Sequence, residues 1–331
     1  MIAPFRPARG LANRHVQSIL SSSAVRRLVV RRRARELLAA SQGEIVTTPQ
    51  GVRLAGWRTP ARTVPRGLTI LLHGWEGSAA SNYLLSAANA LWQAGFEVFR
   101  LNFRDHGDSH HLNRELFHSC RLEEVVEAVA LLSQAAAGPV TLAGFSLGGN
   151  FALRVALAAP GRGIDLARVI AVCPVIRPAG VLDALERGLP LYQRYFERKW
   201  RHSLGRKQAL FPADYDFSEW FTMRGLRAQT RYLIEQHTDF STLEEYLDGY
   251  ALGGDRLAAL RVPTTIVAAA DDPVVPAADF AALPRPPAMQ LRLEAHGGHC
   301  GFLADWRLAS WIDGLLVHTA GRPSQRTVAT R

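Results

Sequence analysis

Short apolar runs alternate with amphipathic segments of helical period from residue 67 to residue 173. The runs are rich in Val, Ile and Leu, which is typical of strands buried on both faces. The segment 122–136 carries three glutamates near its start, where the helix dipole favours acids. The predicted strands are 67–72, 96–103, 139–144 and 169–173, and the predicted helices are 81–94, 122–136 and 151–159. This rhythm predicts a mainly parallel sheet with helices on both faces.

The pattern changes at both ends and in one long insertion. Residues 44–48 and 53–58 predict an antiparallel hairpin around the turn Pro49-Gln50-Gly51. Residues 177–261 are helical and aromatic-rich, strands at 264–270 and 289–294 then complete the sheet, and a helix over 302–316 closes it. We therefore expect an amino-terminal basic extension at 1–43, a core at 44–176 and 262–318, a helical cap at 177–261 and a flexible tail at 319–331.

The balance of charge is strongly basic. The formal net charge is +10, and much of the excess lies in one run at 26–35. Such a run is typical of a solvated basic helix, and it also suits weak contact with an anionic membrane surface. No nucleic-acid partner is expected, because no recognition module or aromatic pattern accompanies the charge.

Composition narrows the class of protein further. A chain of 331 residues that is 48% hydrophobic can bury a sizeable core. Its three cysteines form no CxxC pair, which argues against a disulfide framework and a metal site and favours a reducing compartment. No secretory signal and no run of roughly 18 apolar residues is present. We expect a soluble cytoplasmic protein with no cofactor and no metal, and its oligomeric state stays open.

The strongest motif lies between a predicted buried strand and the start of a helix. It reads Gly144-Phe145-Ser146-Leu147-Gly148-Gly149. A nucleophile on such a sharp turn has a strained backbone and small residues two positions before and after it, so its oxygen is exposed near the positive end of a helix. Ser146 is therefore the predicted nucleophile.

A serine hydroxyl needs a base, and in this arrangement an acid and then a histidine follow it along the chain. His299 is preferred over His296 as the base, because the two glycines before it let the loop curl back toward the serine. Asp272 is preferred over Asp271 as the orienting acid, because a residue before proline is biased to extended geometry. His296 and Asp271 remain as alternatives.

The oxyanion of an acyl-transfer reaction needs backbone N–H donors. Leu147 follows the nucleophile directly, and Trp75 lies in the loop after the first parallel strand, so both are predicted donors. His73 precedes the nucleophile and is assigned a structural role, and Cys300 is assigned to packing. The remaining histidines cluster around two aspartates without a metal-binding spacing, which predicts a polar loop: His106, His110, His111 and His118, with Asp105 and Asp108.

With these motifs in place, the chain resembles the YheT-like group of α/β hydrolases, which are bacterial relatives of the eukaryotic abhydrolase-domain esterases and lipases. The matching features are 13–18, His73-Gly74 with Gly77-Ser78, 144–149, Asp271-Asp272-Pro273, Gly297-Gly298-His299 with Gly301-Phe302, and the cap stretch from Phe221 to Tyr250 ahead of Pro263. The resemblance implies an α/β-hydrolase fold, a triad of Ser146, Asp272 and His299, and hydrolysis of carboxylic esters or lipids.

The predicted activity is esterase-like or lipase-like acyl transfer through an acyl-enzyme. A thioesterase or another acyl hydrolase on the same triad, or a non-catalytic binding protein that keeps the fold, are the alternatives. Aromatic side chains crowd the first part of the cap, and they suit either its own core or an acyl pocket over Ser146: Tyr192, Tyr195, Phe196, Trp200, Phe211, Tyr215, Phe217 and Trp220.

Overall fold

The computed structural model describes residues 2–323, so the end of the predicted tail lies outside the described residues. Within them, one sheet of eight strands has the order β1-β2-β4-β3-β5-β6-β7-β8. Only the pairings made by β2 are antiparallel. The strands are β1 (Gln42–Thr47), β2 (Arg53–Thr59), β3 (Leu68–Leu72), β4 (Glu97–Leu101), β5 (Val140–Phe145), β6 (Leu166–Val172), β7 (Thr264–Ala269) and β8 (Met289–Glu294). The predicted mainly parallel sheet is confirmed.

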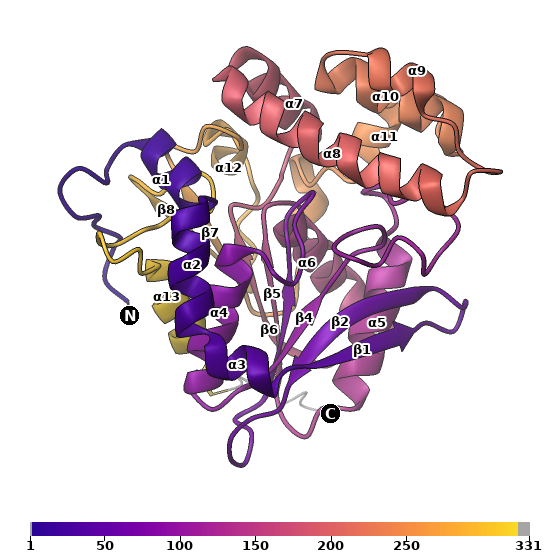
Figure 1. Cartoon of the computed structure of the whole chain (residues 1–331). Helices are drawn as coiled ribbons and strands as arrows, with labels where there is room; N and C mark the ends of the chain where they lie inside the picture. The colour runs from indigo at the N-terminus through magenta and orange to yellow at the C-terminus, as the bar shows by residue number, and fades with distance from the viewer. Residues whose placement is uncertain (1, 324–331) are drawn as a thin grey trace.

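Helices cover both faces of this sheet (Figure 1). On β3, Ile70 and Leu72 point into one hydrophobic core and Leu71 points into the other, because successive side chains of a strand face opposite ways. The first core is covered by α5 (Leu122–Gln134) and α6 (Leu147–Ala158). The second is covered by α2 (Ala24–Arg33), α3 (Arg35–Ala40), α4 (Asn82–Gln93) and α13 (Trp311–Ala320).

A group of helices is inserted between β6 and β7 and lies over one end of the sheet (Figure 1). They are α7 (Pro178–Arg187), α8 (Pro190–Leu210), α9 (Ser218–Thr222), α10 (Leu226–His237) and α11 (Leu243–Gly249). The longest, α8, is fixed to the core by a buried ion pair of 2.8 Å between Lys207 and Asp105. Lys207 Nζ also donates to the carbonyl of Asn113 at 2.7 Å. The buried ammonium group therefore links the cap to the core and has its own hydrogen-bond partners.

The amino-terminal segment is part of the folded body. It forms α1 (Arg14–Ser21) and then α2 and α3, and the second core contains Val30 of α2, Leu37 of α3 and Ala34 between these two helices. Residues 13–18 thereby reach the end of the sheet that lies beneath the cap (Figure 1).

The predicted closing helix at 302–316 was wrong in its first part, because α13 begins only at Trp311. Phe302 and Leu308 have φ of 44° and 61°, which a right-handed helix does not accommodate. Leu303 instead forms an isolated bridge with Ser310, and its backbone N–H donates to the Gln17 side chain at 2.7 Å. Tertiary hydrogen bonds therefore override the helical pattern of this stretch.

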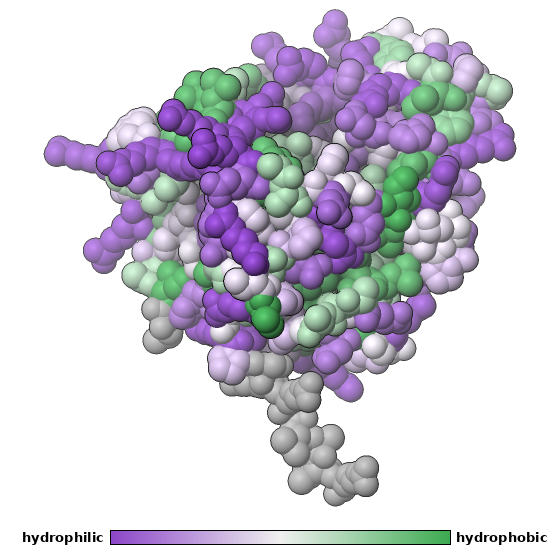
Figure 2. All heavy atoms as spheres, turned by 60° about the horizontal axis from the view of Figure 1, so that its bottom comes forward, coloured by the Kyte–Doolittle hydropathy of each residue, from purple (hydrophilic) through white to green (hydrophobic). Residues whose placement is uncertain are grey.

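The surface is polar over most of the face seen in Figure 2, and hydrophobic side chains form separate patches on it. None of the helices in residues 2–323 combines the length and the apolar character that a membrane crossing requires.

Candidate active site

Ser146 lies at the turn between β5 and α6. Its φ of 54° and ψ of −118° are unfavourable for a residue with a side chain and cost about 1–3 kcal/mol. The turn is held because the Ser146 N–H donates to the Val172 carbonyl at 2.9 Å. A Cβ on Gly144 would lie 2.0 Å from the Gly148 oxygen, and one on Gly148 would lie 2.4 Å from the His73 oxygen. Only glycine therefore fits at these two positions.

The predicted base and acid meet the serine in a continuous chain of hydrogen bonds. Ser146 Oγ and His299 Nε2 are 2.9 Å apart, and His299 Nδ1 and Asp272 Oδ2 are 2.9 Å apart. The other carboxylate oxygen of Asp272 accepts the N–H groups of Val274 and Val275 at 2.8 and 3.0 Å. Asp272 is thus buried, oriented and bonded to the imidazole on the side away from Ser146.

The alternative acid and base lie close by in other roles. Asp271 Oδ1 accepts the Gly298 N–H at 2.9 Å, and its second oxygen lies 3.5 Å from Nδ1 of His296. Both side chains therefore brace the loop that carries His299, and neither makes a hydrogen bond with Ser146 or with the His299 ring.

Helix α1 supports the same loop from its other side. The Ser18 hydroxyl accepts the His299 N–H at 2.8 Å and donates to the Arg14 carbonyl at 2.8 Å. A Cβ on Gly298 would lie 2.5 Å from the Arg14 oxygen, and one on Gly301 would lie 2.7 Å from the Gln17 oxygen. Sequence reasoning missed this role, and the only signal of it was the resemblance of residues 13–18 to a family motif.

The electrostatics of the site favour a charged imidazole. Burial lowers the pKa of His299, but the charge of Asp272, that of Cys300 and the hydrogen bond to Asp272 together outweigh burial and raise the pKa to about 9. An imidazolium is therefore strongly stabilised at this position once it has taken a proton from its neighbour.

The two predicted N–H donors lie beside the serine. Gly74, which precedes Trp75, approaches so closely that its Cβ would lie 3.2 Å from Ser146 Cβ. Within residues 2–323, neither Trp75 nor Leu147 donates its backbone N–H to another group. The Trp75 ring is fixed by stacking on Phe196 with ring centroids 5.1 Å apart. Both N–H groups are thus without a hydrogen-bond partner in this part of the chain, and their role as oxyanion donors stays a prediction.

His73 forms the support of this loop. Its Nε2 accepts the Phe103 N–H at 3.2 Å, so Nδ1 carries the proton and donates to the Gly74 carbonyl at 2.7 Å. Burial lowers the pKa of His73 well below its usual range, which keeps the ring neutral. His106 is similarly buried, accepts the Glu76 N–H at 3.2 Å and has its pKa lowered by burial to about 4.

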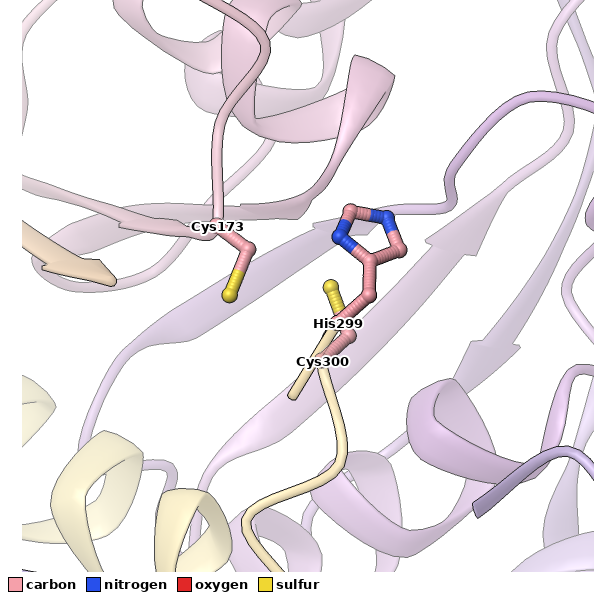
Figure 3. Close-up of side chains that lie close together, drawn as sticks. All are labelled: Cys173, His299 and Cys300. Carbon is pink, nitrogen blue, oxygen red and sulfur yellow. The ribbon is translucent and has the colours of Figure 1, made fainter. Parts of the chain in front are cut away.

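Two cysteines lie beside the imidazole of His299 (Figure 3). The sulfurs of Cys173 and Cys300 and one His299 nitrogen lie within 4.8 Å of one another. The Cys173 thiol points to the Gly298 carbonyl at 3.9 Å, and the Cys300 thiol to the Val172 carbonyl at 3.8 Å. Burial raises the pKa of Cys173 well above its usual range. For Cys300, burial is outweighed by the hydrogen bond with Cys173 and the charge of His299, which lower its pKa. The two sulfurs pack beside the histidine, and the expected absence of a metal and a cofactor stays a prediction.

Two cavities border the site. One of about 110 Å³ lies under the cap and is lined by Trp75, Leu147 and Trp200 among mostly apolar residues. The other, of about 250 Å³, lies between α1 and α8 and is lined by His299 and Tyr192. The aromatic residues of the cap therefore have two roles. Some of their rings line the cavities. Others build a small core in the cap, namely Phe217 and Trp220 with Leu204 and Leu233.

The sheet order, the strained serine turn and the inserted cap together define an α/β hydrolase. Residues 69–305 match the alpha/beta hydrolase fold family, and the chain belongs to that family. "Putative esterase YheT" of Escherichia coli K12 is 28% identical over 335 residues, which cover 96% of this chain and 89% of the relative. "Putative esterase slr0264" of Synechocystis is 25% identical over 289 residues, which cover 79% and 77%. The resemblance to the YheT-like group is thereby confirmed.

A likeness to solved structures extends the same conclusion about the fold. The Pyrococcus furiosus esterase Pf2001 superposes with a TM-score of 0.54 over 86% of this chain and 92% of that one, at 13% sequence identity. At that identity the likeness concerns the fold alone.

Proposed function

We propose that this protein is a serine hydrolase of carboxylic esters, with Ser146 as nucleophile, His299 as general base and Asp272 as the orienting acid. The observation that carries the proposal is the unbroken hydrogen-bonded chain from Asp272 through His299 to Ser146, whose two bonds between side chains are both 2.9 Å long. The esterase names of the two relatives support the same reaction class.

In the first step, Ser146 Oγ forms a bond to the ester carbonyl carbon while its proton passes to His299 Nε2. The carbonyl oxygen becomes an oxyanion and accepts the N–H groups of Trp75 and Leu147. The intermediate then breaks its bond to the alcohol oxygen, which receives the proton from His299. The alcohol leaves, and the acyl group remains on Ser146.

In the second step, water attacks the acyl carbon and gives one proton to His299. The bond to Ser146 Oγ breaks, the serine oxygen recovers that proton, and the carboxylic acid is released. Asp272 accepts the Nδ1–H of His299 in both steps and stabilises the imidazolium. A thioester would pass through the same two steps.

We infer the placement of the two parts of the substrate from the residues that line the two cavities. The alcohol oxygen must reach His299 to be protonated, so the alcohol part lies in the cavity between α1 and α8, which His299 lines. The carbonyl oxygen must reach Leu147, so the acyl chain extends into the apolar cavity under the cap, which Leu147 and Trp75 line. A mostly apolar wall suits an acyl chain longer than acetate.

The test uses p-nitrophenyl esters from acetate to palmitate, acyl thioesters and a fluorophosphonate probe. We expect ester hydrolysis and covalent labelling by the wild-type protein, and loss of both in Ser146→Ala, with activity lowered by about three orders of magnitude or more. Ser241→Ala, at an exposed serine of the cap, is the matched control. Wild-type turnover or labelling in Ser146→Ala would overturn the proposal.

A further inference from the structure

The arginines of the basic run differ sharply in their surroundings. Arg26 is fully buried and donates to the Ser21 carbonyl at 3.2 Å, and Arg33 donates to the Arg307 carbonyl at 2.8 Å. Arg27 and Arg31 are exposed and lie four residues apart on α2, which places them on the same face about 6 Å apart along the axis. These last two arginines border a cavity near the active site.

This cavity of about 260 Å³ is lined by Arg27, Arg31 and, from α8, Lys199. None of its lining residues is acidic. Within residues 2–323, no carboxylate lies within 4.0 Å of these three cationic groups. The rest of the wall includes hydroxyl groups, among them those of Ser22, Ser78, Ser81 and Tyr195. A wall of cations and hydroxyls is suited to an anion that has several oxygens.

Lys199 is held in place from both sides. Its ammonium group donates to the Glu76 carbonyl at 2.6 Å and lies 5.3 Å from the centre of the Tyr195 ring. Burial raises the pKa of the Glu76 carboxyl to about 8, against the attraction of Lys199. At neutral pH this carboxyl is therefore mainly protonated and leaves the positive charge of Lys199 uncompensated.

The cationic cavity adjoins the cavity to which we assign the alcohol part of the substrate. Ser22 and Tyr195 line both of them, and His299 lines the second. Because Ser22 and Tyr195 belong to both walls, a group attached to the alcohol oxygen at His299 extends toward the three cations.

We propose that Arg27, Arg31 and Lys199 form an anion subsite, and that the preferred substrates are esters whose alcohol part carries a phosphate group. The proposal rests on the proposed function, because it extends the alcohol side of the same site. The phosphate belongs either to a soluble phosphorylated ester or to the head group of a lipid.

The test compares two soluble esters that differ only in charge on the alcohol part. They are the hexanoate of 4-hydroxyphenyl phosphate and the hexanoate of 4-methoxyphenol. We expect kcat/KM to be about tenfold higher for the phosphate ester at low salt, because exposed ion pairs each contribute severalfold and are screened by salt. In Arg27→Gln/Arg31→Gln this ratio falls toward one.

The matched control is Arg32→Gln/Arg35→Gln, which removes the same charge at two exposed arginines that line none of these cavities. We expect the control to keep the wild-type ratio. A ratio near one in the wild-type protein, or an equal fall in both double variants, would overturn the subsite.

Two further measurements separate the subsite from the reaction and identify the source of the phosphate. Binding of glycerol 3-phosphate to Ser146→Ala, measured by calorimetry, is expected to weaken in Arg27→Gln/Arg31→Gln. If the protein hydrolyses no ester but this binding behaves as expected, only the proposed function fails.

The source of the phosphate is tested by comparing hydrolysis of phosphatidylglycerol in vesicles with hydrolysis of the soluble phosphate ester. Charge dependence seen only with vesicles, and lost equally in the control variant, would contradict the subsite and indicate general attraction of α2 to a membrane surface.

Discussion

Replacing Asp272 by asparagine tests the most specific part of the site. The substitution keeps an oxygen for the N–H groups of Val274 and Val275 but presents an amide to His299 in place of a carboxylate. The pKa of His299 is about 9 rather than the usual 6.5, a difference that corresponds to roughly 3 kcal/mol of imidazolium stabilisation. Loss of this stabilisation and of the correct tautomer should lower kcat by about a thousandfold.

The matched substitution is Asp271→Asn, which removes the same charge from the adjacent residue. Its side-chain oxygen still accepts the Gly298 N–H, so we expect less than about a tenfold loss, as for a single supporting interaction. Both variants are assayed with the best p-nitrophenyl ester from pH 5 to pH 10, and thermal unfolding checks that each one is folded.

The pH profile gives an independent readout. Only a neutral imidazole acts as a base, so wild-type kcat/KM should rise with pH through the pKa of His299, which is about 9. Removing the negative charge of Asp272 lowers this pKa and moves the inflection to lower pH. A loss in Asp271→Asn equal to or larger than that in Asp272→Asn, or an unchanged inflection in Asp272→Asn, would refute the assignment.

Three other outcomes follow from the packing of the site. Ser18→Ala should lower kcat by about tenfold with KM nearly constant, because one hydrogen bond that holds His299 is lost. Ser18→Thr keeps a hydroxyl and should retain more activity. A change in KM alone would contradict a positioning role for Ser18. Lys207→Met should lower the free energy of unfolding by about 3–5 kcal/mol, because Asp105 is left buried without its partner. The change is measured by urea unfolding, and a change below about 1 kcal/mol would contradict this expectation. Acyl chains should raise kcat/KM about threefold to fourfold per methylene until the cavity under the cap is filled, and a profile that is flat or highest at acetate would remove the acyl-pocket assignment.

The sequence predicted those parts of the fold and site that depend on neighbours along the chain. Most buried strands show as runs rich in apolar residues. The serine turn shows as glycines at fixed distances from Ser146, because a Cβ at Gly144 or Gly148 would collide with backbone. The sequence also selected Asp272 and His299 by their order and by the local geometry of their loops.

The parts that sequence reasoning missed depend on contacts between distant segments. The stretch 302–310 has a helical pattern, yet the Leu303 N–H donates to the side chain of Gln17, which is 286 residues away along the chain. Ser18 carries no local signal for its contact with His299. The charge of α2 was evident, but which arginines face a cavity depends on how α2 and α8 lie together.

The hydrogen bond from the His299 N–H to the Ser18 hydroxyl has a consequence for how the protein acquires activity. The two residues are 281 positions apart, and contacts of such high sequence separation form late, since the entropy of closing so long a loop must be overcome first. The sheet extends from Gln42 to Glu294 and needs neither α1 nor the histidine loop, whereas the hydrogen bond between Ser18 and His299 forms only after the first helix has docked. During refolding from denaturant, helical circular dichroism should therefore recover before ester hydrolysis, and the delay between the two signals reports the docking of α1.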